Sequence, residues 1–152
     1  MRLALYQPDI PQNTGTIMRL AACLGVSIDV IGPAGFDMSD RNLRRAGLDY
    51  LEHVDLIRHE SFDSFTASRS GHPGRLVLLT AHAATRHCDF VFEAADTLLL
   101  GRESAGVPDA VHESADARIR IPMQAGLRSL NIAVAAAIVL GEALRQTAAF
   151  PR

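Results

Sequence analysis

Short apolar runs alternate along the chain with longer segments in which apolar and polar residues are mixed. Runs of this kind, rich in Leu, Ile and Val, are typical of strands that are buried on both faces of a parallel sheet. The pattern predicts strands at residues 2–6, 26–31, 54–57, 76–80, 97–100 and 118–121.

Helices are predicted in the segments between these strands. Asn13 or Thr14 is expected to cap a helix that ends at Leu24, because Gly25 is a favourable residue just beyond a helix. Further helices are predicted at residues 39–46, 61–68, 108–114 and 129–146, whereas residues 88–95 are ambiguous. The alternation predicts one α/β domain, residues 1–152, with a mostly parallel sheet that helices cover on both faces.

Ligands of open α/β sheets bind beyond the carboxyl ends of the strands. The loops of interest therefore follow Tyr6, Thr80, Leu100 and Ile121. Three of these four loops combine glycine with charged and amide residues. We expect a ligand site where they meet.

The loop after the first strand continues into NTGTIMR, from Asn13 to Arg19. These two residues lie close to two helical turns apart, at about 3.6 residues per turn, so both could face the strand ends. The purely structural alternative makes Asn13 a helix cap and Arg19 a solvated helix residue. This segment alone favours the structural alternative.

The sequence LLLGRESAGVP, residues 98–108, leads from a buried strand directly into glycine and an Arg-Glu pair. Gly101 permits a sharp turn where a side chain would clash with a ligand, and Gly106 and Pro108 fix the exit into the next helix. A ligand loop and a structural turn explain this segment equally well. GxxxxGK[ST] and GxGxxG are both missing from it, which argues against a phosphate loop and a dinucleotide fold.

The last predicted helix follows RIRIPMQAGLRSLN and is apolar on nearly every side from Ser129 or Leu130 onward. Such a helix is expected to be buried all round, either in the core or against another subunit. Ser129 and Asn131 stand at its start. They either satisfy free N–H groups of the helix or contribute to a polar ligand site.

The charge balance changes this picture little. Fifteen basic residues, all arginine, against seventeen acidic ones give a net charge of −2, which argues mildly against a nucleic-acid partner. Guanidinium groups nevertheless suit phosphate and base recognition, although a GC-rich genome explains the missing lysine more simply. Arg41, Arg44 and Arg45 form the densest basic cluster of the sequence.

Several classes are disfavoured by what the sequence lacks. Cys23 and Cys88 have no paired spacing and are expected to be buried, reduced thiols, which favours the cytoplasm. No apolar run reaches the roughly 18 residues of a membrane span, and the first strand is too short for a signal peptide. His82, His87 and Cys88 lack zinc-site spacing, and GxSxG is absent, so neither a metal site nor a serine hydrolase is expected.

Taken together, the three loops resemble the motifs of the SPOUT superfamily of RNA ribose 2′-O-methyltransferases. The motifs are IPQNTGTIMRL, LLLGRESAGVP and IPMQAGLRSLNIAVAAAIVLGEALRQ, and the resemblance covers essentially the whole chain. LRRAGLDY, residues 43–50, resembles a stretch typical of the subfamily that modifies the wobble nucleotide of leucine tRNAs.

This resemblance implies a SPOUT fold with a C-terminal trefoil knot, a homodimer, S-adenosylmethionine bound in the knot, and the tRNA anticodon loop as partner. No metal is implied. The implied cofactor residues are Leu79, Thr80, Gly101, Arg102, Glu103, Ile121, Pro122, Met123, Ser129 and Leu130. The implied catalytic residues are Asn13, Arg19, Glu103, Ser129 and Asn131. The residues expected to contact RNA are Arg41, Arg44, Arg45 and Arg128.

The implied reaction is in-line methyl transfer from a sulfonium to a ribose 2′-hydroxyl. Arg19 is the group that the resemblance assigns to activation of the hydroxyl. Because a guanidinium has a pKa above about 12, a protonated Arg19 could instead stabilise the developing alkoxide. The alternatives are methylation of another tRNA position or of ribosomal RNA, a non-catalytic RNA-binding dimer, and a small-molecule enzyme of dinucleotide type.

Overall fold

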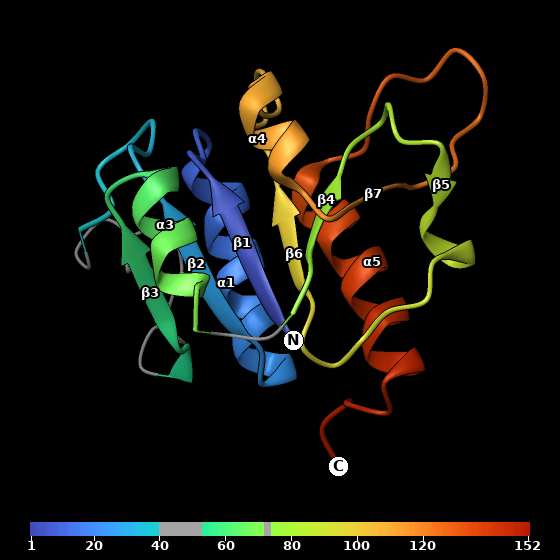
Figure 1. Ribbon diagram of the computed structural model, residues 1–152, viewed down its shortest axis with the longest axis horizontal. Helices are drawn as coiled ribbons and strands as arrows, with labels where there is room; N and C mark the ends of the chain where they lie inside the picture. Colours follow the sequence, from blue (N-terminus) through green and yellow to red (C-terminus); the bar gives the residue numbers. More distant parts are fainter. Residues whose placement is uncertain (40–52, 72–73) are drawn as a thin grey trace.

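The computed structural model describes residues 1–39, 53–71 and 74–152 (Figure 1). The strands are β1 (Arg2–Tyr6), β2 (Ser27–Ile31), β3 (Leu56–His59), β4 (Leu76–Leu79), β5 (Thr85–Arg86), β6 (Thr97–Leu100) and β7 (Ala117–Arg120). The helices are α1 (Pro11–Leu24), α3 (Phe62–Arg69), the short 3₁₀ helix η2 (His87–Asp89), α4 (Asp109–Ser114) and α5 (Ile132–Gln146).

The seven strands form one sheet in the order β3-β2-β1-β6-β4-β7-β5, and neighbouring strands are parallel throughout. β1 lies between β2 and β6, with Leu3 paired to Ile28 on one side and to Leu98 on the other. The predicted α/β class with a mostly parallel sheet is thereby confirmed. Because the strands are parallel, their carboxyl ends share one edge of the sheet.

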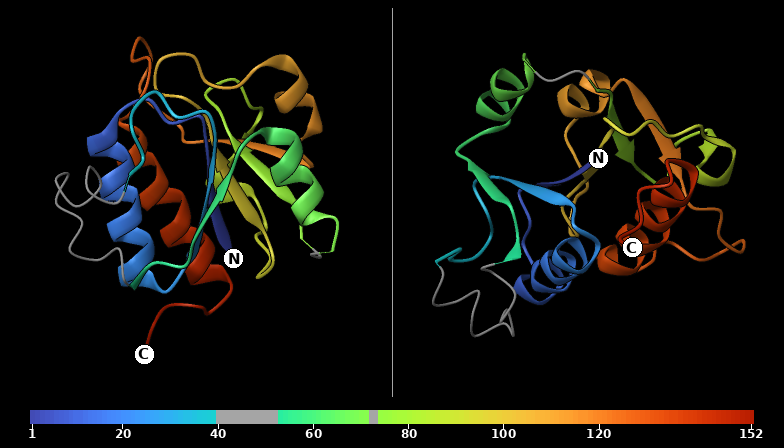
Figure 2. Two further views of the ribbon diagram at one scale, coloured as in Figure 1. Left: turned by 90° about the vertical axis from the view of Figure 1, so that its left-hand side faces the viewer. Right: turned by 90° about the horizontal axis from the view of Figure 1, so that it is seen from below.

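Both faces of the central strands are buried. Successive side chains of a strand point to opposite faces, so each of these strands contributes to two cores. Leu3 and Leu5 of β1 belong to a core shared with α1 and α5, whereas Ala4 and Tyr6 belong to a second core shared with α3 and α4. Figure 2 shows the resulting three layers, with α1 and α5 on one side of the sheet and α3 and α4 on the other.

Some element boundaries differ from those that the sequence predicts. The predicted cap of α1 at Asn13 or Thr14 is wrong, because Ile10 occupies the N-cap position and Pro11 begins the helix. Proline is favourable there because its missing N–H would have no helical partner. β3 runs from Leu56 to His59, two residues later than predicted, because this edge strand continues into the polar pair Arg58 and His59 and an apolar run does not mark its end. The predicted helix 39–46 falls largely outside the described residues.

The two cysteines also depart from expectation. Cys23 and Cys88 are both exposed, free thiols, so the prediction that they are buried is wrong. Cys23 lies off the stripe of α1 residues that faces the sheet, which includes Met18 and Ala21. Cys88 lies in the 3₁₀ turn η2, in which no residue is buried.

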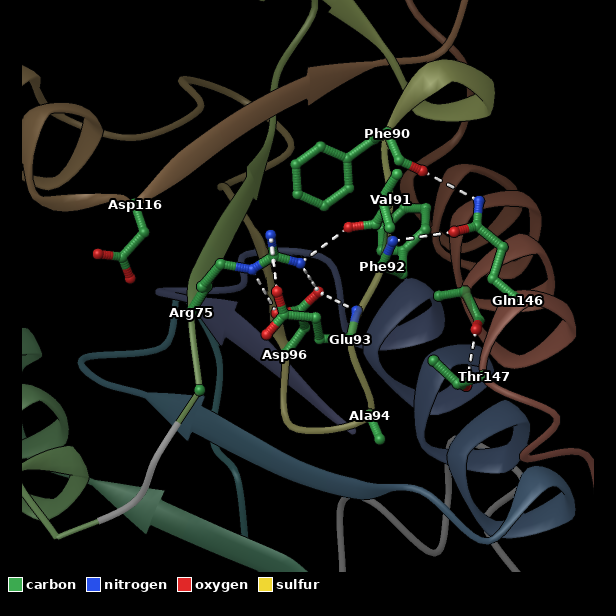
Figure 3. Close-up of polar contacts among 12 residues, drawn as sticks. Arg75, Phe90, Val91, Phe92, Glu93, Ala94, Asp96, Asp116, Gln146 and Thr147 are labelled. Carbon is green, nitrogen blue, oxygen red and sulfur yellow. Dashed lines mark hydrogen bonds and ion pairs between the residues drawn. The ribbon is translucent and has the colours of Figure 1, made fainter.

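An ion pair between the partly exposed Arg75 and the buried Asp96 ties the start of β4 to the segment before β6 (Figure 3). The Arg75 guanidinium donates to Asp96 Oδ1 at 2.9 Å and to Asp96 Oδ2 at 2.8 Å. Arg75 also donates to the carbonyl of Val91 at 2.9 Å and lies 4.9 Å from the Phe90 ring centre. Gln146 of α5 donates to the carbonyl of Phe90 at 3.0 Å. These contacts fix the segment before β6 to the sheet and to α5, at the amino ends of the strands.

Candidate functional site

A pocket of about 830 Å³ opens at the carboxyl edge of the sheet. Its walls come from the loops after β1, β4, β6 and β7, which are the four loops that the sequence marks out. All but one of the expected cofactor residues line it: Leu79, Thr80, Gly101, Arg102, Glu103, Ile121, Met123, Ser129 and Leu130. Volumes of roughly 300–1,000 Å³ are typical of pockets that hold small molecules and cofactors.

Three polar side chains from separate loops meet at this pocket. Asn131 Nδ2 donates to Asn13 Oδ1 at 2.9 Å, and Asn13 Nδ2 donates to Glu103 Oε1 at 3.3 Å. All three side chains line the pocket. The start of α1, the loop after β6 and the start of α5 are therefore joined by one hydrogen-bonded chain.

Asn131 also caps α5. Its Oδ1 accepts from the backbone N–H of Ala133 at 2.9 Å and of Val134 at 3.4 Å, while its amide nitrogen is used for Asn13. Asn131 thus does both things that the sequence allows: it satisfies free N–H groups of the helix and it contributes to the polar site. Asn13 lies within the first turn of α1 and does not cap it, which leaves its whole amide available to the two neighbouring loops.

The loop after β6 is closed on itself. Arg102 N donates to Gly106 O at 2.8 Å, and Gly106 N donates to Arg102 O at 2.9 Å. A Cβ on Gly101 would lie 2.7 Å from the carbonyl carbon of Gly106, so a side chain at 101 would collide with this loop itself. The sequence predicts a glycine at 101 to leave room for a ligand. The structure adds a second reason, because the closed loop itself leaves no room for a side chain at this position.

Glu103 is held by Asp9 from the loop after β1. Asp9 N donates to Glu103 Oε2, and Glu103 N donates to Asp9 Oδ1, each at 3.2 Å. Burial raises the pKa of Glu103, and its contact with Asp9 raises it further. The contact with Glu103, followed by the hydroxyl of Ser104, lowers the pKa of Asp9 to about 2. Of the two carboxylates, Glu103 is therefore the one that takes a proton more readily as the pH falls.

Some of the expected residues lie elsewhere. Arg19 is exposed on α1, and Arg128 is exposed in the loop before α5; neither lines the pocket. Pro122 is the one expected cofactor residue that does not line it. Arg41, Arg44 and Arg45 lie outside the described residues, as does the stretch at residues 43–50.

Other pocket residues were not among the expected ones. Ile10 and His82 follow β1 and β4, so the rule that ligands bind beyond strand ends could have included them. Asp109 and His112 come from α4, and nothing in the sequence singles them out. The carbonyl of His112 accepts from Arg118 Nε at 2.9 Å, which fixes the end of α4 to β7.

Two further observations bear on the class of site. Within residues 1–39, 53–71 and 74–152, no group of three or more His, Cys, Asp or Glu side chains is arranged to hold a metal ion. None of the helices described is long and apolar enough to cross a membrane.

The protein is an α/β protein with a ligand-sized pocket at the carboxyl edge of a parallel sheet. A carboxylate hydrogen-bonded to two amides at that pocket equips the site for polar chemistry. The sequence identifies the family. The chain belongs to the SpoU rRNA Methylase family, whose model matches residues 1–141.

Individual relatives are similar over nearly the whole chain. A tRNA (cytidine(34)-2'-O)-methyltransferase of Beijerinckia indica subsp. indica is 61% identical over 150 residues, which cover 99% of this chain and 94% of the relative. A solved structure described as giving insights into the 2-OH methylation of C/U34 on tRNA is 42% identical with a TM-score of 0.87, over 95% of this chain and 94% of that one. The SpoU methyltransferase AviRb from Streptomyces viridochromogenes, solved in complex with AdoMet, is 34% identical with a TM-score of 0.84, over 96% of this chain and 60% of AviRb.

Proposed function

We propose that this protein transfers a methyl group from S-adenosylmethionine to the ribose 2′-hydroxyl of the wobble nucleotide in leucine tRNAs, whether cytidine or modified uridine. The observation that carries the proposal is the hydrogen-bonded chain of Glu103, Asn13 and Asn131 at the pocket. Relatives that share nearly the whole chain are methyltransferases acting on cytidine 34 of tRNA, which supports this substrate.

The pocket fits S-adenosylmethionine, which combines a nucleoside with a charged sulfonium and an amino-acid tail. Leu79, Leu100 and Ile121 offer apolar surface, and the ends of their strands offer backbone groups. Arg102 Nε is buried and has no hydrogen-bond partner, although it lies 3.7 Å from Asp9 Oδ2. The rest of the Arg102 side chain, which lines the pocket and is 37% exposed as a whole, is available to a polar group of the ligand. When bound, the cofactor supplies an electrophilic methyl group on a sulfonium centre.

The residues of the chain would then act mainly by orientation. Holding the hydroxyl in line with the methyl group can contribute about 7–11 kcal/mol to lowering the barrier. We propose that Glu103, Asn13 and Asn131 orient the ribose, and that Ser129 at the same pocket contacts ribose or cofactor. The hydroxyl has to lose its proton as the methyl group is transferred to its oxygen, and the raised pKa of Glu103 suits a carboxylate that takes up this proton.

Arg19 is proposed as the group that stabilises the developing alkoxide. Because it is exposed and outside the pocket of its own chain, this role requires a substrate that extends over α1, or the pocket of a partner subunit. Arg128 and the cluster Arg41, Arg44 and Arg45 are proposed to contact phosphates of the anticodon loop. Such contacts predict that tRNA affinity falls as the salt concentration rises.

We also propose a homodimer and a C-terminal trefoil knot within a single domain. The support for the dimer is an apolar face on α5, where Val134 is 49% exposed and Ile138 is 39% exposed; Leu127, in the loop before α5, is 68% exposed. A second subunit on this face would bury the last helix all round, which is one of the two ways in which the sequence leads us to expect its burial. The support for the knot is family membership. A tRNA substrate would place the enzyme in the cytoplasm.

The test uses leucine tRNA transcripts with radiolabelled S-adenosylmethionine. One transcript carries an ordinary ribose at the wobble nucleotide, and its matched control carries 2′-deoxyribose there. Label is expected on the first and not on the second. Label on both would place the methyl group elsewhere in the tRNA. Ribosomal RNA is assayed in parallel, and label on it alone would favour the alternative substrate.

A further inference from the structure

Asp9 lies in the loop between β1 and α1 and does not itself line the pocket. Its side chain is only 16% exposed. In the sheet, β1 has β2 on one side and β6 on the other. The loops that follow these two neighbours both reach Asp9, from opposite sides.

On the side of β6, one carboxylate holds three consecutive residues. Glu103 N donates to Asp9 Oδ1 at 3.2 Å, and the hydroxyl of Ser104 donates to Asp9 Oδ2. The guanidinium of Arg102 forms an ion pair with the same carboxylate at 3.7 Å. The side chain of Asp9 therefore fixes the backbone from which Glu103 extends toward Asn13.

On the side of β2, Gly35 packs directly against Asp9. A Cβ built on Gly35 would lie 2.8 Å from Asp9 Cβ and 3.0 Å from Asp9 Cα. Gly35 N also donates to the carbonyl of Pro8 at 2.9 Å. A side chain at position 35 would therefore collide with Asp9, and the close approach of Gly35 together with its hydrogen bond to Pro8 supports the backbone of Asp9 on the side of β2.

We propose that Asp9 is a positioning residue for the proposed methyl transfer, acting through Glu103 by fixing the loop after β6. The reaction in this inference rests on the proposed function. What is inferred about the structure is an energetic coupling between Asp9 and Glu103. Asp9 stands at one end of a series of hydrogen bonds that continues through Glu103 and Asn13 to Asn131. Its low pKa keeps it a charged acceptor at neutral pH, as this role requires.

The test is a double-mutant cycle with Asp9→Ala, Glu103→Ala and the double variant. Methyl transfer to leucine tRNA is measured in single turnover with enzyme in excess, so that slow variants still give measurable product. Binding of S-adenosylmethionine is measured by calorimetry on the same four proteins. Asp63→Ala serves as a matched control, because Asp63 is exposed on α3, which covers the face of the sheet opposite to α1 and α5. Thermal melting of each protein shows whether it is folded.

If Asp9 acts through Glu103, Asp9→Ala slows transfer about tenfold in the wild-type background and less than twofold in the Glu103→Ala background. Equal losses in the two backgrounds, or wild-type rates in Asp9→Ala, would overturn the inference. If Glu103→Ala gives no product, the effect of Asp9→Ala in the two backgrounds is compared through the dissociation constants for S-adenosylmethionine. Asp9→Asn keeps the acceptor for Glu103 N and is expected to retain more activity than Asp9→Ala. If the wild type transfers no methyl group but the dissociation constants for S-adenosylmethionine still show coupling between Asp9 and Glu103, the result counts against the proposed function and not against the role of Asp9.

Discussion

Replacing Arg75 with methionine tests whether the ion pair before β6 stabilises the fold. Methionine keeps an apolar side chain of similar length over the Phe90 ring but removes every donor to Asp96 that Arg75 supplies. Asp96 is completely buried and would keep only the backbone N–H of Glu93, which donates to Asp96 Oδ2 at 2.8 Å. The substitution thus leaves a buried carboxylate without its counter-charge.

The expected loss follows from that geometry. Removing one partner of a buried ion pair typically costs about 3–5 kcal/mol, because the remaining charge is uncompensated. Arg75 itself is 32% exposed, so water can reach part of the space it leaves, and the lower end of the range applies. A loss of about 3 kcal/mol is a large share of the roughly 5–15 kcal/mol that stabilises a typical protein. At roughly 2–4 °C per kcal/mol for a chain of this size, the Tm should fall by about 6–12 °C.

Urea unfolding followed by circular dichroism gives the free energy of unfolding, and differential scanning calorimetry gives the Tm. The matched control is Arg86→Met, which breaks the exposed pair of Arg86 with Asp89 and should leave the Tm nearly unchanged. The double variant Arg75→Met/Asp96→Leu should recover part of the loss, because no charge remains buried. A Tm change in Arg75→Met no larger than in the control would refute the reasoning.

Three further substitutions test the site, the dimer and the Asp9 carboxylate. Gly101→Ala would force the loop after β6 away from Gly106, and calorimetry should show S-adenosylmethionine binding at least tenfold weaker. Val134→Glu places a charge on the exposed apolar face of α5, so light scattering should show a monomer, whereas the wild type is expected to be the proposed dimer. The folded pKa of Asp9, about 2, lies below its ordinary value of 3.8, so its charge stabilises the fold above about pH 4 and this contribution is lost as the pH falls through 2. The stability difference between wild type and Asp9→Asn, from urea unfolding, should therefore shrink from pH 5 to pH 2; a constant difference would contradict the assignment.

Much of the fold could be predicted because buried parallel strands are continuous apolar runs. β1, β4 and β6 are such runs, and their predicted and observed bounds nearly coincide. β5 has only two residues, both exposed, and gives no pattern to detect. α1 begins before its predicted start because the proline at its first position was a better start signal than the amide and hydroxyl residues that follow.

The loops that build the pocket were also predictable, since parallel strands bring their carboxyl ends to one edge. The particular contacts were not. Asp9 and Glu103 are 94 positions apart, and they meet only because β6 lies beside β1 in the sheet. Nothing local to either residue encodes that strand order. Asn13 illustrates the same limit: a helix-cap residue by its sequence, it becomes a site residue because the helix starts earlier and other loops approach it.

The central claim is that this pocket directs methylation to the ribose of one tRNA nucleotide. The most direct test incubates the purified protein and S-adenosylmethionine with bulk tRNA from cells that lack it, followed by digestion and mass-spectrometric mapping of the methylated nucleoside. We expect a single new 2′-O-methylated nucleoside at the wobble position, and its loss in the Glu103→Ala variant. A methyl group on a base, or on the ribose of a different position, would contradict it.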